Sequence, residues 1–342
     1  MLILAKSYRF SLLSLLVVLA FSLVSCRGDE TKKRYIKVEG EALGTFVAVT
    51  CNTDKDEADI AEMVSRVDSE AKASMSIFDG GSLLSRINRG ETDVVDRHIA
   101  RNIEIAGRFT ELSGGAYDVT IKPLTEAWGF AAKECNGEEP NIDSLLQFVG
   151  FEKVRVEEAR LVRDDERVQL DFNSIAKGYT VDLVAEELES MGTDDYLVNI
   201  GGEIRCKGEN PKGENWSIAI ETPYDGNFEM DSYQKIVRLT DCGLATSGNY
   251  RRFYYTDDGR KVAHTIDPRT GRSVISDLLS ATVVAPTCAE ADAAATMFMA
   301  MGSEGGALEL AKRCEREYGW KYYFIYADGE QYRIECSDEF RD

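Results

Sequence analysis

The clearest local unit of this chain is the stretch Val168-Gln169-Leu170-Asp171-Phe172-Asn173-Ser174-Ile175-Ala176-Lys177. Its first five residues predict a short strand, and a helix is expected from about Ile175 to Met191. Asn173 or Ser174 is expected to cap this helix, and Gly192 is expected to end it. A strand that runs directly into a helix leaves backbone N–H groups free at the helix N-terminus. The unit therefore predicts a site for an anion.

Strands and helices are mixed on both sides of this unit without a regular βαβ rhythm, which favours an α+β fold with mixed, mostly antiparallel strands and flanking helices. Helices are expected at 56–73, 82–88, 97–113, 289–301 and 304–318. Strands are expected at 35–51 with a break at Gly44, and at 154–156, 161–163, 196–200, 204–206, 216–221 and 235–239. Asp258-Gly259 and Asp328-Gly329 each predict a hairpin turn, whereas 114–118 and 244–248 are expected to be turns of small residues.

The first residues differ from the rest of the chain. Lys6 and Arg9 precede the apolar run Phe10–Val24, which is followed by Ser25 and Cys26. This pattern is typical of a secretory signal that ends in a lipobox. The run is shorter than the ~20 residues of a spanning helix, so a permanent transmembrane anchor is the less favoured alternative. We expect 1–25 to be a lipoprotein signal peptide and 26–34 a lipidated tether, with the protein exported and anchored to a bacterial membrane, facing the periplasm or extracytoplasmic space.

Composition excludes several classes of function. The formal charge of −20 and the lack of a basic block argue against direct binding to nucleic acid. The chain has eight cysteines and two histidines, without a CxxC motif or a Cys/His cluster, so a zinc site is not expected. Besides Cys26, the cysteines are interpreted mostly as small buried side chains. One or two disulfides remain an alternative in an oxidising compartment.

Two pairs of residues point to phosphate and metal chemistry. Asp292 and Thr296 are four apart on a predicted helix, so their oxygens share a face and suit a hard cation such as Mg²⁺. Ser174 and Lys177, near Asp171, share a face at the start of another helix, where a lysine is favourable beside an anion. The alternatives are structural. Asp292 would cap its helix or pair with a basic residue, the Thr296 hydroxyl would bond to the backbone of its own helix, and Lys177 would be solvated.

His264 follows the first predicted hairpin turn. Strand periodicity puts His264 and Ile266 on one face, where they could line a pocket together. An imidazole there can act as a general base near neutral pH. A purely structural histidine is the alternative.

Eight motifs occur in a fixed order along the chain. They are Gly40–Thr45, Met75–Phe78 before Ser82–Asn88, Gly115–Thr120, Leu170–Asp182, Asn199–Gly202, Thr246–Gly248, His264–Gly271 and Ala291–Thr296. In this order they resemble the FAD:protein FMN transferases, the ApbE family. The resemblance spans residues 35–335, which we interpret as one ApbE-like domain followed by a C-terminal tail at 336–342.

The resemblance implies an enzyme that uses Mg²⁺ to cleave FAD and attaches FMN through a phosphoester bond to a threonine or serine of a target protein, releasing AMP. It implies two interlocked lobes with a central flavin cleft. The targets it implies are flavin-accepting subunits of membrane redox complexes, of the sodium-pumping quinone reductase or Rnf type. The implied FAD-binding residues are Leu43, Phe78, Ala116, Tyr117, Asp118, Asp171, Lys177 and Ile266. The implied magnesium ligands are Ser174, Asp292 and Thr296, and His264 is the hypothetical general base.

The chain departs from the usual family pattern at two positions. Leu43 stands where methionine is usual, and Phe78 where tyrosine is usual. Both keep an apolar flavin contact, but Phe78 lacks a hydroxyl group. Ser174 can ligate through its carbonyl or its hydroxyl oxygen. Two other functions use the same residues: a Mg²⁺-dependent FAD pyrophosphatase that gives FMN and AMP, and a non-catalytic FAD-binding lipoprotein.

Overall fold

The computed structural model describes residues 33–130, 140–223, 233–249, 253–255, 261–329 and 331–341. The expected signal peptide and Cys26 lie outside the described residues. From Tyr35 onward the chain forms one compact unit, so the two lobes implied by the resemblance are not separate domains. Among the helices of the described part, none has the length and apolar character needed to cross a membrane.

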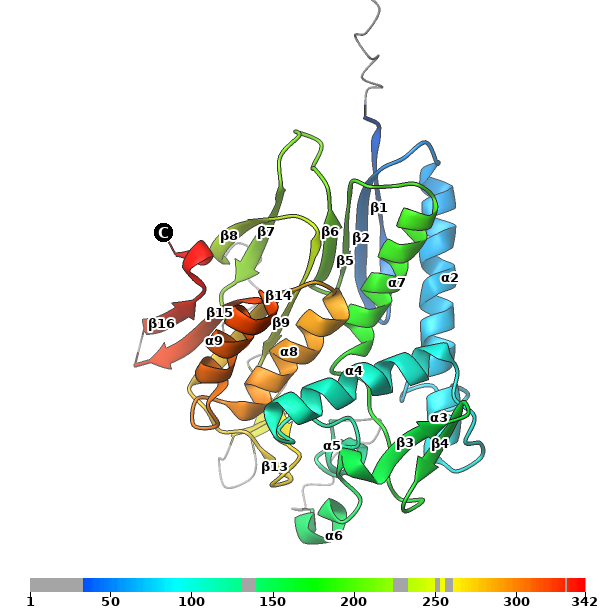
Figure 1. The fold of residues 1–342 in the computed structure, drawn as a ribbon, viewed down its shortest axis with the longest axis vertical. Coiled ribbons are helices and arrows are strands. Elements are labelled where there is room, and N and C mark those ends of the chain that lie inside the picture. Colours follow the sequence, from blue (N-terminus) through cyan, green and yellow to red (C-terminus); the bar gives the residue numbers. More distant parts are fainter. Residues whose placement is uncertain are drawn as a thin grey trace, which may run out of the picture. The chain divides into compact units, whose positions relative to one another are not determined.

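An eight-stranded sheet forms the centre of this unit (Figure 1). Its neighbouring strands all pair antiparallel, in the order β1-β2-β5-β6-β9-β14-β15-β16. The strands are β1 (Tyr35–Ala42), β2 (Thr45–Asn52), β5 (Tyr196–Ile200), β6 (Glu203–Lys207), β9 (Cys242–Gly248), β14 (Leu278–Ala285), β15 (Lys321–Asp328) and β16 (Gln331–Cys336). The predicted α+β class with mostly antiparallel strands is confirmed.

Helices cover one face of the sheet. α7 contacts β5 and β6, and α8 contacts β9, β14 and α7 (Figure 1). The helices are α2 (Glu57–Met75), α3 (Leu83–Asn88), α4 (Arg97–Ser113), α5 (Lys122–Ala127), α6 (Ile142–Leu146), α7 (Ala176–Ser190), α8 (Cys288–Met301) and α9 (Ala307–Tyr318). Short hairpins complete the fold: β3 (Val154–Glu157) with β4 (Arg160–Arg163), β7 (Trp216–Glu221) with β8 (Tyr233–Leu239), β10 (Phe253–Tyr255) with β11 (Lys261–Ala263), and β12 (Ile266–Asp267) with β13 (Arg272–Ser273).

The sheet is buried on both faces. On β14, Val283 belongs to the core cluster under the helices, and the next residue, Val284, belongs to a different cluster that contains Trp216 of β7. Alternation along the strand explains this, because successive side chains point to opposite faces. Phe340, in the expected C-terminal tail, is buried in the same cluster as Trp216.

Two predictions for the stretch 168–177 are wrong. Residues 168–172 do not form a strand, because the Asn88 side chain takes the place of a partner strand: it donates to Leu170 O and accepts from Leu170 N, both at 2.8 Å. The α7 N-cap is Ile175, without a side-chain capping bond, so neither Asn173 nor Ser174 caps the helix.

The turn expected at 244–248 lies within the central strand β9. The residue before this range, Gly243, lets the start of α8 approach β9, since a Cβ there would overlap the backbone of Cys288. By contrast, α4, β5 and β7 have the expected bounds.

Candidate functional site

A cavity of about 790 Å³ lies among α2, α7, α8 and β9. Small-molecule sites typically have ~300–1,000 Å³. The structure brings six of the predicted site residues together in the cavity wall: Leu43, Phe78, Lys177, His264, Asp292 and Thr296. The other six, Ala116, Tyr117, Asp118, Asp171, Ser174 and Ile266, are placed in the surrounding structure.

The floor of the cavity is formed where α7 and α8 cross. Gly178 N on α7 donates a 3.0 Å hydrogen bond to Asp292 Oδ2 on α8. The helices approach closely because residue 178 has no side chain: a Cβ there would lie 2.8 Å from Asp292 Cβ. Asp292 is only 4% exposed. Burial, and secondly the charge of Glu203, raise the pKa of Asp292 to about 7, while Lys177 opposes the shift.

Glu203, at the start of β6, faces Lys177 across this floor. Its Oε1 lies 2.5 Å from Lys177 Nζ. Glu203 is 2% exposed, and its second oxygen, Oε2, is buried without a hydrogen-bond partner. Two buried carboxylates therefore share one lysine, which makes the floor attractive for a cation.

Hydroxyl groups lie next to the carboxylates. Thr296 is one turn along α8 from Asp292, and its Oγ1 lies 3.1 Å from Ser247 Oγ on β9. Carboxylate and hydroxyl oxygens are hard ligands of the type that Mg²⁺ prefers. In the described part of the chain no three His, Cys, Asp or Glu side chains cluster as a metal site, so a cation here would need further oxygen ligands from hydroxyls, backbone carbonyls, substrate or water.

Ser174 is connected to the loop that follows α4. Its Oγ donates a 2.9 Å hydrogen bond to Tyr117 Oη. Tyr117 is buried, and burial raises its pKa well above the ordinary value, so the phenol stays protonated. Ala116, beside it, is fully buried. With its hydroxyl engaged in this bond, Ser174 has its backbone carbonyl as the other oxygen for a ligand.

Asp118 does not line the cavity but stabilises the loop that follows α4. Its Oδ1 accepts from Thr120 N and Oγ1, at 2.8 and 2.7 Å, and its Oδ2 accepts from Phe151 N at 2.8 Å. Burial raises the pKa of Asp118, and these bonds oppose the shift. Both carboxylate oxygens are thus used within the protein.

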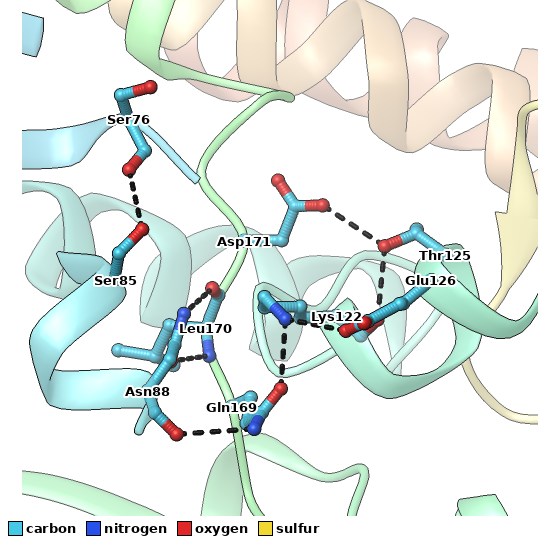
Figure 2. A network of polar contacts seen from close by, with 9 residues as sticks. All are labelled: Ser76, Ser85, Asn88, Lys122, Thr125, Glu126, Gln169, Leu170 and Asp171. Carbon is cyan, nitrogen blue, oxygen red and sulfur yellow. Dashed lines mark hydrogen bonds and ion pairs between the residues drawn. The ribbon is translucent and has the colours of Figure 1, made fainter. Parts of the chain in front are cut away.

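Asp171 belongs to a polar network in the segment that leads into α7 (Figure 2). Thr125 Oγ1 donates to Asp171 Oδ2 at 3.1 Å, and Asn173 N donates to Oδ1 at 2.9 Å. Two residues earlier, Gln169 accepts from Lys122 Nζ at 2.9 Å (Figure 2). This network fixes the segment that leads into Lys177.

His264 lies between β11 and β12, half-buried in the cavity wall. The Phe130 ring meets it edge-on, with centroids 6.3 Å apart. Ile266 packs into a separate core cluster with Leu124, because the break between the two strands interrupts the alternation that was expected to put both residues in one pocket.

Two wall positions mark the cavity entrance. Phe78 is 58% exposed. Leu43 forms a two-residue hairpin turn with Gly44, and both have positive φ, 51° and 73°. Such a turn favours asparagine or glycine. The backbone of Leu43 is therefore strained, at a position in the wall of a candidate binding site.

Among the cavity residues that sequence reasoning gave no role are Glu203 and Ser247. Glu203 follows the Gly201-Gly202 pair directly, and an acidic residue that opens a buried strand is a signal that was available. Ser247 was included in a turn and in the motif Thr246–Gly248 but was given no role, because its relation to Thr296 depends on how β9 and α8 pack.

An α+β fold whose cavity combines a lysine, two buried carboxylates and a histidine defines an enzyme that acts on a small charged ligand. The chain belongs to the ApbE family, whose model matches residues 43–320.

Curated relatives and solved structures agree with this assignment. The chain is 34% identical over 316 residues to an FAD:protein FMN transferase of Haemophilus influenzae, covering 87% of this chain and 88% of that protein. A second protein of that name, from Vibrio cholerae, is 35% identical over 300 residues, covering 85% and 88%. The solved structure of the flavin transferase ApbE from Vibrio cholerae has a TM-score of 0.78 at 32% identity, covering 90% of this chain and 98% of that one.

Proposed function

We propose that this protein is an FAD:protein FMN transferase, which splits the diphosphate of FAD and transfers FMN to a hydroxyl group of an acceptor protein. The observation that carries the proposal is the cavity of about 790 Å³, which Lys177, Asp292 and His264 line together. Relatives that carry this enzyme name match most of the chain.

We propose Mg²⁺ as the cofactor. Asp292 and Thr296 would hold it, with Ser174 adding its backbone carbonyl. Two observations support this: Glu203 Oε2 is buried without a hydrogen-bond partner, and the carboxylates of Glu203 and Asp292 share the single positive charge of Lys177. When bound, the cation would neutralise charge on the diphosphate.

The residues of the chain have distinct tasks in this reaction. Lys177, at the start of α7, would neutralise a phosphate oxygen, helped by the positive end of the helix. His264 would accept the proton of the acceptor hydroxyl as its oxygen bonds to the phosphorus of the FMN half. The bond from that phosphorus to the bridging oxygen breaks, and AMP leaves with the bridging oxygen.

Leu43 and Phe78 would contact the flavin at the cavity entrance. Four further residues would support the FAD site without lining the cavity, because their side chains are buried or hydrogen-bonded within the protein. They are Asp171, Tyr117, Ala116 and Asp118. Ile266 would support the wall next to His264.

The proposal extends to the place and partners of the protein. We propose export and lipid anchoring through Cys26, facing the periplasm or extracytoplasmic space, on the strength of the lipobox pattern. A transferase anchored there would meet flavin-accepting subunits of membrane redox complexes of the sodium-pumping quinone reductase or Rnf type.

The test is to incubate the full-length protein with FAD, Mg²⁺ and such a subunit, and to measure the acceptor by mass spectrometry and in-gel flavin fluorescence. We expect a mass increase of one FMN, lost on adding EDTA. His264→Ala should lower the transfer rate by about 10²–10⁴-fold with FAD binding retained.

His98→Asn is the matched control, because His98 is buried against Tyr179 and does not line the cavity. Equal losses in both variants would reject His264 as the base. Release of FMN and AMP without labelling of any acceptor would favour the pyrophosphatase, and bound intact FAD would favour a carrier.

A further inference from the structure

Two cysteines face each other across the centre of the sheet. Cys206 on β6 is the register partner of Cys242 on β9. Directly opposed residues of antiparallel strands have Cα atoms ~4.5–5.5 Å apart. Disulfides span Cα separations of ~4.4–6.8 Å. The register therefore puts the pair within bridging distance without movement of the backbone.

Both side chains point to the same face of the sheet. Cys206 is fully buried in the cluster that contains Trp216, and Cys242 packs against that cluster. Interaction between the two thiols lowers the pKa of Cys242 and raises that of Cys206. Cys242 is half-buried, so it is the thiol that a reagent can reach first.

We propose that Cys206 and Cys242 are a modification site that closes to a cross-strand disulfide when the protein meets a disulfide oxidant, either a protein dithiol–disulfide or a small-molecule disulfide. The Cys242 thiolate attacks one sulfur of the oxidant and displaces the other as a thiol. Cys206 then loses its proton and attacks Sγ of Cys242, which releases the second thiol. Two cysteine thiols are oxidised, and one disulfide of the oxidant is reduced to two thiols.

The bond would join the two strands that build one side of the cavity. β6 begins with Glu203, and β9 continues from Cys242 to Ser247. The disulfide lies on the opposite face from α7 and α8, because Cys206 and its neighbours on that face pack against β7 and β8. It would therefore fix the spacing of the two strands without entering the cavity.

The experiment uses the full-length protein, purified reduced in detergent and then treated with oxidised glutathione. We expect the count of free thiols in denaturant to fall by two. Trypsin without reductant should give a peptide in which Cys206-Lys207 is joined to Leu239–Arg251. Cys314→Ser, in α9, should keep both results.

Two variants keep the test decisive. Cys242→Ser and Cys206→Ala should each abolish the joined peptide, and at least one should fold, because Cys242 is only half-buried. Persistence of both thiols in the wild-type protein would overturn the proposal. Trapping of Cys242 as a stable mixed disulfide, without the joined peptide, would overturn it as well.

Discussion

Replacing Gly178 by alanine tests whether the crossing of α7 and α8 builds the site. Gly178 is the third residue of α7 and donates its N–H to Asp292. An added Cβ would lie 2.8 Å from both Asp292 Cβ and the carbonyl carbon of Cys288. Ordinary contacts between carbon atoms are ~3.5–4.0 Å. The two helices must therefore separate by roughly 1 Å.

The size of the effect on stability follows from two terms. Overpacking a close contact costs about 1–3 kcal/mol, and more when backbone atoms are involved. Alanine returns about 1 kcal/mol of helix propensity relative to glycine. Because the added Cβ meets the backbone of Cys288, the upper end of the overpacking range applies, and we expect a net loss of about 2 kcal/mol in the free energy of unfolding. A 1 Å shift of catalytic groups can cost about 10²-fold in rate, so FMN transfer should fall more than stability does.

Urea unfolding and the FMN-transfer rate measure the two effects. Gly107→Ala is the control, because its Cβ would meet only the Phe151 ring, at 2.9 Å, and a half-buried side chain can turn away. The control should transfer FMN at nearly the wild-type rate. Wild-type stability together with wild-type transfer in Gly178→Ala would refute the claim that this contact sets the floor of the cavity.

Three further substitutions probe charge and strain. Glu203→Gln removes one of the two buried carboxylates, so Mg²⁺ should bind about tenfold more weakly by calorimetry; unchanged binding would contradict the role of the charge. Burial raises the pKa of Asp182 from 3.8 to about 6, so the folded protein holds its proton more tightly and this group lowers stability as pH rises from about 4 to 6. Asp182→Asn should remove this pH dependence, which is worth about 3 kcal/mol of unfolding free energy. If the curves of unfolding free energy against pH were parallel for variant and wild type, Asp182 would not be the group responsible. Leu43→Asn should relieve positive-φ strain and add about 1 kcal/mol of stability while weakening FAD binding; a loss of stability would show that the turn is unstrained.

The sequence predicts best those features that depend on neighbouring residues. α4 begins and ends where its apolar spacing and Gly114 indicate, and the Asp328-Gly329 turn joins β15 to β16. β14 was missed, since its apolar residues are buried on both faces and show no alternation. The strand expected at 168–172 failed for a different reason: Asn88, far away in the chain, binds its backbone.

The same distinction applies to the site. Asp292 and Thr296 lie on one face of α8, as their spacing predicts. The closeness of Glu203 to Lys177 depends on β6 passing beside α7, which no local pattern encodes. Ile266 did not reach the cavity, because the strand that was expected to carry both Ile266 and His264 is divided into two.

The buried charges of the floor explain why such a costly arrangement is kept. A buried carboxylate oxygen without a hydrogen bond lowers the stability of the folded protein, and Glu203 Oε2 is such an atom. Replacing the buried charged residues of the floor by apolar residues would remove this cost, but it would also remove the negative charge that attracts a cation. A ligand that binds only the folded state adds about 2.7 kcal/mol at 100 times its Kd. On the proposed function, the buried charges of the floor lower the stability of the empty protein, and binding of Mg²⁺ and FAD in the cavity offsets this loss. Glu203→Gln should therefore stabilise the ligand-free protein. The rise in Tm on adding Mg²⁺ should be smaller in this variant than in the wild type.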